Sequence, residues 1–175
     1  GDIYSDDHVT LSGDGARLDA DTAYLGKNSQ TIDYNIVADH FGKKTESLIT
    51  VNGALTDSAK KVFRGTIDFK KGSADSVGSE NETVLMLGDD VVNKTVPLIL
   101  CAEENVEGSH GATIGELDED TLFYFASRGI DMETAEDMMT KGKMEVLYRK
   151  IQDEDTEKLV EKQLAEVMEY DRQEL

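Results

Sequence analysis

Residues 84–100 read Val-Leu-Met-Leu-Gly-Asp-Asp-Val-Val-Asn-Lys-Thr-Val-Pro-Leu-Ile-Leu. Two short apolar runs rich in branched side chains flank a Gly-Asp-Asp turn. Such runs are typical of β-strands, because branched side chains pack well on a pleated surface. No helical period of 3.6 residues interrupts the pattern between about Leu25 and Leu117, so the sequence predicts an all-β region. The strand-like segments are 32–37, 48–51, 62–69, 84–87, 96–100 and 112–114.

Two β architectures are compatible with this pattern, a sandwich and a solenoid. Both are built from many short strands separated by Gly, Asn and Asp. The predicted strands begin near residues 48, 62, 84 and 96, and this uneven spacing shows no clear sequence repeat. A solenoid would therefore need turns of unequal length. The residue pattern alone leaves both architectures open.

The last third of the chain has a helical pattern. Asp118 offers an N-cap for a first helix that Gly129 ends, and Asp131 caps a second helix that we expect to end at Gly142. Their apolar stripes must be buried against the β region, against each other, or against another protein. The expected helices cover about 119–128, 131–142, 143–152 and the residues from 155 onward.

Composition narrows the functional classes. The chain has 37 acidic and 18 basic residues and a formal net charge of −19, which disfavours nucleic acid and anionic membrane surfaces as partners. The apolar runs are too short to span a membrane. A single cysteine excludes an internal disulfide and suits a reducing cytosol, so a cytoplasmic protein is expected. The chain begins Gly-Asp-Ile without a methionine, so we expect that it is a piece of a longer protein.

The residues that could carry chemistry form no catalytic constellation. The histidines His8, His40 and His110 lack the spacing of a preformed metal site, so a hydrogen-bonded structural role or a surface position is the favoured interpretation of each. Cys101 ends an apolar run, where a thiol is more often a small buried hydrophobic group than a ligand. The sequence therefore predicts no enzyme active site.

Two stretches resemble the C-terminal signature of the SufB/SufD family in order and spacing. They are Ser-His-Gly-Ala-Thr-Ile-Gly-Glu-Leu-Asp at 109–118 and Leu-Phe-Tyr-Phe-Ala-Ser-Arg-Gly-Ile at 122–130. Upstream, Val-Phe-Arg-Gly-Thr-Ile at 62–67 resembles the family's Val-Phe-x-Gly-x-Ile strand, and Pro97 precedes the histidine motif as in the family. The likeness is specific from about His40 to Met144.

At two positions where SufB-like and SufD-like chains differ, this sequence is similar to the SufD-like chains. Gly111 stands where SufB-like chains have a glutamate, and residues 82–88 contain no cysteine where SufB-like chains have their cluster-scaffold cysteine. Cys101 lies in the following strand and does not match that position. The resemblance implies that residues 1–117 are the C-terminal part of a right-handed parallel β-helix, which we expect to be truncated at its N-terminal end. An α-helical partner-binding module over 118–175 is expected to follow.

The same resemblance implies a function. It indicates a non-catalytic scaffold subunit of iron–sulfur cluster assembly that pairs with a SufB-like subunit, docks a SufC-like ATPase on its C-terminal helices and aids iron acquisition. We expect no cofactor to bind this chain stably on its own, whereas iron or a nascent iron–sulfur cluster is held in the full complex with His110 as one ligand. Tyr124 and Arg128 are the expected ATPase contacts, while Leu122 and Phe123 are expected to pack inward.

Two other functions remain as alternatives. A structural β-helix that self-associates would form a homodimer in isolation, because a solenoid that ends abruptly exposes unpaired strands. An enzyme of the β-solenoid type would need an acid and a base, for which Asp33 and Asp39 are candidates. No spacing in the sequence supports that pair.

Overall fold

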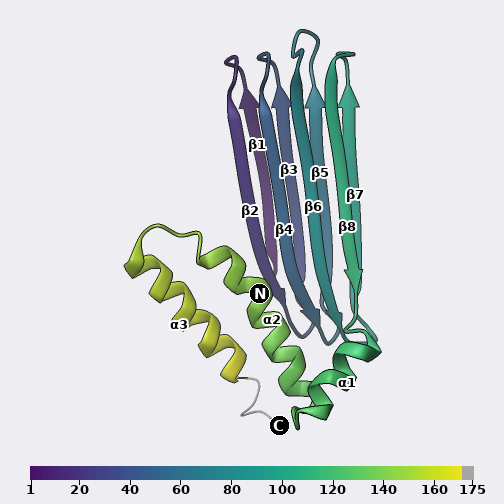
Figure 1. The fold of residues 1–175 in the computed structure, drawn as a ribbon, viewed down its shortest axis with the longest axis vertical. Coiled ribbons are helices and arrows are strands. Elements are labelled where there is room, and N and C mark those ends of the chain that lie inside the picture. Colours follow the sequence, from purple (N-terminus) through teal and green to yellow (C-terminus); the bar gives the residue numbers. More distant parts are fainter. Residues whose placement is uncertain (171–175) are drawn as a thin grey trace. The chain divides into compact units, whose positions relative to one another are not determined.

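The computed structural model describes residues 1–170, and its contacts divide the chain into a β part, Gly1–Gly115, and a helical part that begins at Glu116. The β part contains eight strands (Figure 1). They are β1 (Ile3–Leu11), β2 (Arg17–Gly26), β3 (Thr31–His40), β4 (Glu46–Thr56), β5 (Lys60–Phe69), β6 (Ser76–Leu87), β7 (Val92–Cys101) and β8 (Val106–Gly115).

The strands form two four-stranded sheets, in the order β1-β3-β5-β7 and β2-β4-β6-β8. Every neighbouring pair is parallel, from β1 with β3 to β6 with β8. Each turn of the chain thus contributes one strand to each sheet, which is the arrangement of a parallel β-solenoid. The prediction of a β-helix is confirmed, and the antiparallel sandwich is excluded.

The turns differ in length, which explains why no repeat was visible in the sequence. Thr31 bonds to Asp2, 29 residues earlier, whereas Thr45 bonds to Ser76, 31 residues later. The pairing nevertheless stacks side chains of one kind above each other, because every second residue of a strand faces the same way. The column Ala38, Ile67 and Ile99 is an example.

The interior between the sheets is mainly apolar. Ile32, Ile49, Phe63 and Ile67 are at most 1% exposed, and burial of such side chains is the main favourable term in folding. Alternation of buried and less buried residues along β5 shows directly which face is inside. The remaining members of this core cluster are Tyr24, Ile36, Ala38, Val51, Leu55, Ala59, Phe69 and Val84.

The first two strands were not among the strand segments expected from the sequence. β1 and β2 contain several aspartates, which are depleted in strands, and no run of branched apolar residues. They form because the following turn supplies their partners. On β1, Asp6 accepts a hydrogen bond from the Asn35 amide of β3 at 2.7 Å.

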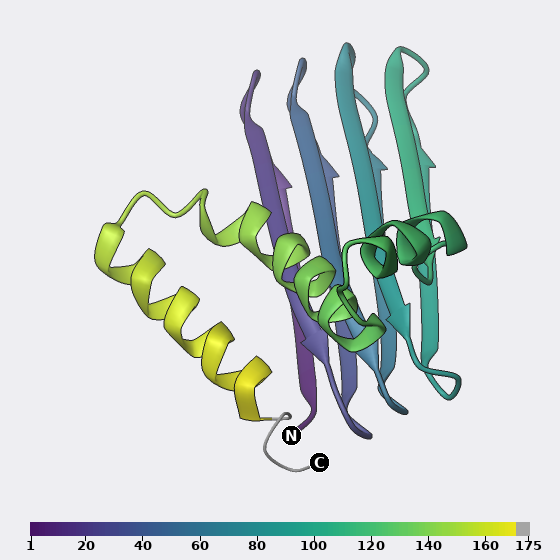
Figure 2. The same cartoon turned by 60° about the horizontal axis from the view of Figure 1, so that its bottom comes forward.

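The helical part contains three helices: α1 (Glu119–Ser127), α2 (Met132–Tyr148) and α3 (Glu154–Tyr170) (Figure 2). The predicted N-caps are confirmed, since the Asp118 carboxylate accepts from the Thr121 amide at 2.7 Å and Asp131 accepts from Thr134 at 2.8 Å. Gly129, with φ of +76°, follows the first helix as expected. α2 contacts both α1 and α3.

Two expectations for the helices are wrong. α2 runs through Gly142, so one helix replaces the expected second and third helices. The helix can continue because a single glycine costs it only about 1 kcal/mol. Phe123 is 75% exposed and does not pack inward, because it lies about 100° around α1 from Leu122, which is half-buried. Among the described residues, no helix is long and apolar enough to cross a membrane.

Candidate functional site at the last turn of the β-helix

β7 and β8 form the last turn of the solenoid, and each is the final strand of its sheet. Amides of outward-facing residues bond back to the preceding turn, as in Val77 to Thr45 and Val92 to Ala59. Inward-facing residues therefore direct their backbone groups toward the next turn, because these directions alternate along a strand. Within residues 1–115 no further strand follows β7 or β8, so these backbone groups lie on free edges.

His110 lies in the middle of β8, in register with the buried Glu80 of β6. Its neighbour Ser109 donates to the Ser79 hydroxyl at 3.2 Å on the outer face of the sheet. Side chains alternate along a strand, so His110 belongs to the inner face, where it is exposed because no turn covers it. The structure thus places the sequence-predicted histidine at the end of the solenoid interior.

The two glycines beside His110 have different environments. A Cβ atom at Gly108 would lie 2.7 Å from Ile99 Cγ2, too close for any larger residue without a shift. At Gly111 the nearest atom would be Asn81 Oδ1 at 3.5 Å, an ordinary contact distance. Space therefore requires glycine at 108 but not at 111, where the outer face has room for a larger side chain.

His110 belongs to no group of metal-ligating side chains among the described residues. Across residues 1–170, no three His, Cys, Asp or Glu side chains are placed to hold a metal ion together. Cys101 is in register with Phe69 at the far end of β7 and is exposed, contrary to the expected burial. The thiol is exposed because it lies on the uncovered last turn. A stable iron site needs several ligands, so the others would have to come from outside residues 1–170.

The other two histidines have different surroundings. His40 is completely buried, and its ring nitrogens lie 2.7 Å from Thr45 Oγ1 and 2.9 Å from Ser47 Oγ. Burial lowers the pKa of His40, so the neutral ring with both nitrogens hydrogen-bonded is a structural element. His8 is exposed on β1 and lies 3.3 Å from the Asp6 carboxylate.

A charged cluster that was not expected from the sequence lies inside the solenoid. Lys61 of β5 and Glu82 of β6 form an ion pair whose side chains are both completely buried. Thr95 of β7 donates to Glu82 Oε2 at 2.5 Å and accepts from Lys61 Nζ at 3.3 Å. A signal was present: Lys61 has the same parity as the apolar inward residues Phe63 and Ile67, so the strand pattern itself placed it inside.

Glu80 adds a second carboxyl group to this interior. It is 3% exposed, and burial together with the nearby Glu82 raises its pKa to about 7, although Lys61 opposes the shift. A Cβ atom at Gly65 on the facing strand would collide with the Glu80 carboxyl group. The glycine therefore makes the space that this carboxyl group occupies.

The predicted partner contacts, Tyr124 on α1 and Arg128 at the C-cap of that helix, are both exposed. Tyr124 is 56% exposed, and the Arg128 guanidinium lies 5.4 Å from the centre of its ring, a cation–π distance. Phe123 adds a third large exposed side chain to the same short helix. None of the residues of α1 is buried.

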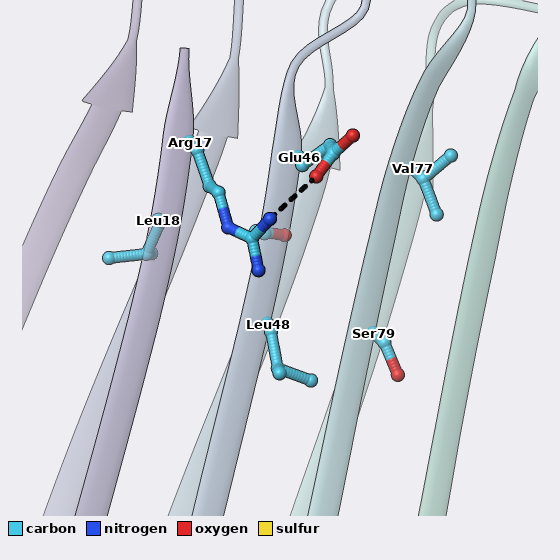
Figure 3. A pocket seen from close by; sticks show the side chains of 7 residues that line it. Arg17, Leu18, Glu46, Leu48, Val77 and Ser79 are labelled. Atoms are coloured by element: carbon cyan, nitrogen blue, oxygen red, sulfur yellow. Dashed lines mark hydrogen bonds and ion pairs between the residues drawn. The ribbon is translucent and has the colours of Figure 1, made fainter. Parts of the chain in front are cut away.

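The outer face of the even-numbered sheet carries a shallow hollow (Figure 3). Arg17 and Glu46 form an ion pair of 3.3 Å across it, while Leu48, Val77 and Ser79 lie beside them. Both charged side chains are more than half exposed. The hollow holds no group of donors for a metal and no nucleophile next to a base.

Asp33 and Asp39, the candidate acid and base of the alternative enzyme function, each form an ion pair with a basic side chain. Asp33 is paired with Arg64, and Asp39 lies 3.1 Å from Lys70 Nζ. These ion pairs bind successive turns of the same sheet together. The arrangement gives no isolated acid and base facing a common cavity.

Residues 1–143 match the family described as "SUF system FeS cluster assembly, SufBD core domain". The chain belongs to this SufBD family, and the match reaches further toward the N-terminus than the signature from His40 onward. Within the family it is SufD-like. It is 32% identical, over 97% of its length, to "Iron-sulfur cluster assembly protein SufD" of Bacillus subtilis.

Two relatives from a plant are similar to smaller shares of the chain. The chain is 28% identical over 83% of its length to "Iron-sulfur cluster assembly SufBD family protein ABCI8, chloroplastic" of Arabidopsis thaliana. It is 31% identical over 73% of its length to "Protein ABCI7, chloroplastic" of the same plant. The chain spans only 38% of the Bacillus protein and about a quarter of the two plant proteins.

Proposed function

We propose that this chain is part of a non-catalytic scaffold subunit for iron–sulfur cluster assembly in the cytoplasm. The last turn of its β-helix pairs with a SufB-like subunit, and its helical part docks a SufC-like ATPase that hydrolyses ATP. The scaffold also helps iron to reach the cluster. Iron or the nascent cluster is cargo of the complex, and His110 is one of its ligands there.

The observation that carries this proposal is the uncovered last turn that bears the histidine motif. β8 offers the backbone groups of His110 and Ala112 on a free edge, which suits the addition of a partner strand. The imidazole lies on the same inner face, so a partner bound to this edge could supply the missing ligands next to it. Family membership supports the role in cluster assembly.

Pairing with the SufB-like subunit can be tested by co-purification. Ala112→Pro removes an amide from the free edge and leaves the bonds of β8 to β6 in place, because the amide of Ala112 faces away from β6. We expect this variant to lose the SufB-like subunit and to retain the SufC-like ATPase. Ala112→Val, which keeps the amide, is the control. Equal recovery of the SufB-like subunit with all three chains would reject pairing at this edge.

Docking of the ATPase is tested separately. Arg128→Glu reverses a charge on the exposed face of α1, next to Tyr124. We expect recovery of the SufC-like ATPase to fall at least about tenfold, as for a hot-spot arginine, without loss of helix content. Lys141→Glu reverses another exposed charge, on α2, and should have little effect. If both reversals act alike, the contact depends on total charge and not on α1.

The role of His110 is tested in the assembled complex. His110→Ala should lower the yield of cluster, measured by its visible absorbance, while complex formation and ATPase activity persist. His8→Ala removes another exposed histidine and should leave the yield unchanged. The isolated chain should bind iron no better than its His110→Ala variant, because one imidazole is an incomplete site. Equal cluster yields from wild type and His110→Ala would make the histidine structural.

Self-association is the second candidate function, and the free edges of β7 and β8 favour it. A homodimer of the isolated chain would use the same edge as the SufB-like subunit. Its mass in solution should then fall to that of a monomer in Ala112→Pro. A dimer that persists when the SufB-like subunit is present in excess would favour the structural role.

A further inference from the structure

Strand β7 presents most of its apolar side chains outward, whereas Ile99 packs against the core. Val96, Leu98 and Leu100 are 44%, 46% and 46% exposed, whereas Thr95 and Pro97 face the interior. The register confirms this orientation, because each outward residue of β7 lies beside an outward residue of β5. These pairs are Val96 with Arg64, Leu98 with Thr66 and Leu100 with Asp68.

Hydropathy alone favours the opposite orientation. Side chains alternate with a period of two, so a shift of one residue would turn every side chain of β7 to the other face. Val96, Leu98 and Leu100 would then pack on Phe63 and Ile67. Thr95 and Ile99 would leave the interior, so the shift would bury more apolar side chains than it exposes. The observed register therefore needs an interaction that outweighs the apolar surface left outside.

The buried ion pair supplies such an interaction through Thr95. Its hydroxyl donates to Glu82 Oε2 at 2.5 Å and lies 3.3 Å from Lys61 Nζ. Both charged side chains are completely buried, so they have no water with which to replace a lost partner. A shift would leave a buried carboxylate oxygen without this bond, and unpaired buried polar groups are costly.

Two further consequences of a shift also make the shifted register unfavourable. The amide of Val92 donates to Ala59, just before β5, and the amide of Ala102 donates to Phe69 at the end of β5. The backbone groups of the even-numbered residues therefore face β5, and the nitrogen of Pro97 faces the free edge. A shift would turn Pro97 toward β5, where it cannot donate. It would also turn Lys94 inward, close to the buried Lys61, because Asn93 now lies beside Lys61.

We propose that the buried Lys61–Glu82 pair fixes the register of the last odd-numbered strand through Thr95, and so keeps Val96, Leu98 and Leu100 on the outer face. The ion pair specifies one of two possible facings of β7, and stability is a secondary effect. Buried polar groups that select one register over another are the best-attested use of such pairs. This role does not depend on the function proposed above.

A disulfide trap reports the register directly. Cysteines at positions 64 and 96 lie side by side on the outer face in the observed register, and adjacent strands are close enough for a disulfide. The trap is Arg64→Cys with Val96→Cys in a Cys101→Ser chain. It is combined with Thr95→Val, which removes the hydroxyl at similar volume, with Thr95→Ser, which retains it, or with Thr66→Val, a matched change on the outer face.

We expect cross-linking to fall about fivefold with Thr95→Val, the scale of one buried hydrogen bond, and to persist with Thr95→Ser and Thr66→Val. Lys61→Met with Glu82→Leu should lower it as well, because an apolar replacement of the pair keeps the fold but no longer selects a register. Methyl groups of Leu98 and Leu100 should then show nuclear Overhauser effects to Phe63 and Phe69.

Three results would overturn the proposal. Cross-linking that stays at the wild-type level in both Thr95→Val and the doubly apolar variant would show that Pro97 and packing set the register. Cross-linking lost equally with Thr95→Ser would show that the methyl group of Thr95, and not its hydroxyl, matters. Circular dichroism identifies variants that unfold. If Thr95→Val unfolds while Thr95→Ser folds, the hydroxyl supports the turn but does not select a register, and the proposal fails.

Discussion

Tyr24 buries a polar group within the apolar core of this β-helix. Tyr24 places its ring where Gly53 has no side chain, and its hydroxyl is buried without a protein partner among the described residues. Burial raises the pKa of Tyr24, and Glu82 and Tyr34 add to the shift. Such positions tolerate little change, because interiors are close-packed.

Gly53→Ala tests this packing. A Cβ atom at residue 53 would lie only 2.2 Å from Tyr24 Cζ, and the Tyr24 ring is part of the core cluster. We expect the free energy of unfolding to fall by about 1–3 kcal/mol or more, as for other overpacked sites. Urea titration followed by circular dichroism measures the change. Gly115→Ala, where no atom lies within 4 Å, is the control, and equal losses from both would contradict the packing argument.

Glu80 predicts a dependence of stability on pH. Its pKa is raised to about 7 in the folded chain from an ordinary value of 4.5, because of burial and the nearby Glu82, so the folded state favours the protonated carboxyl group. The stability from this group is complete below about pH 4.5 and is lost as the pH rises through about 7. Lys61 and Glu82 are the charged groups that act on it.

Glu80→Gln isolates that contribution, because glutamine has a similar shape and does not ionise. From pH 5 to pH 8 the wild type should lose up to about 3 kcal/mol relative to the variant, at about 1.4 kcal/mol per pKa unit. Urea unfolding at each pH measures the difference. Parallel curves for the two proteins would show that Glu80 is ionised in the folded chain throughout.

Among the helices, the capping residues Asp118 and Asp131 set where α1 and α2 begin. Where α2 ends also depends on its packing contacts. α2 begins at its capping residue Asp131, but it passes Gly142 because a glycine in a helix is unfavourable without being forbidden. The helix is further supported by buried residues, among them Ala135 and Met144, and contacts both neighbouring helices. These contacts outweigh the cost of one glycine.

Gly142→Ala should therefore stabilise the helical part. Residue 142 has no atom within 4 Å of a built Cβ and no positive φ, so alanine fits without strain. We expect a gain of about 0.5–1 kcal/mol in the free energy of unfolding, measured by thermal or urea unfolding. Gly129→Ala is the contrasting change, because φ of +76° there disfavours alanine. A loss of stability from Gly142→Ala would mean that this glycine has another structural task.

At the scale of the whole molecule, a formal net charge of −19 opposes the compact state. Ion pairs between turns, such as Asp33 with Arg64, relieve only part of the repulsion. We expect the midpoint of thermal unfolding to rise between about 10 mM and 500 mM sodium chloride, because salt shortens the Debye length. Potassium chloride should act alike. A midpoint that falls with either salt would show that ion pairs outweigh repulsion.

Much of the architecture was predictable from the sequence. The six expected strand segments all lie inside strands of the solenoid, and both predicted caps begin helices. These features are local, because side-chain periodicity and capping depend on residues within a few positions of each other. The histidine motif was also found in the sequence, at residues 109–113, although only pairing with β6 showed that His110 faces the interior.

The contacts between residues of successive turns became visible only in the folded chain. It showed that β1 and β2 are strands, that Cys101 is exposed, and that Lys61 meets Glu82 and Thr95 inside the core. Parallel pairing joins residues about 30 positions apart, in turns of unequal length, so spacing along the chain gave no measure of these contacts. A buried charge is tolerated only where its partners meet it, and that meeting is a property of the folded solenoid.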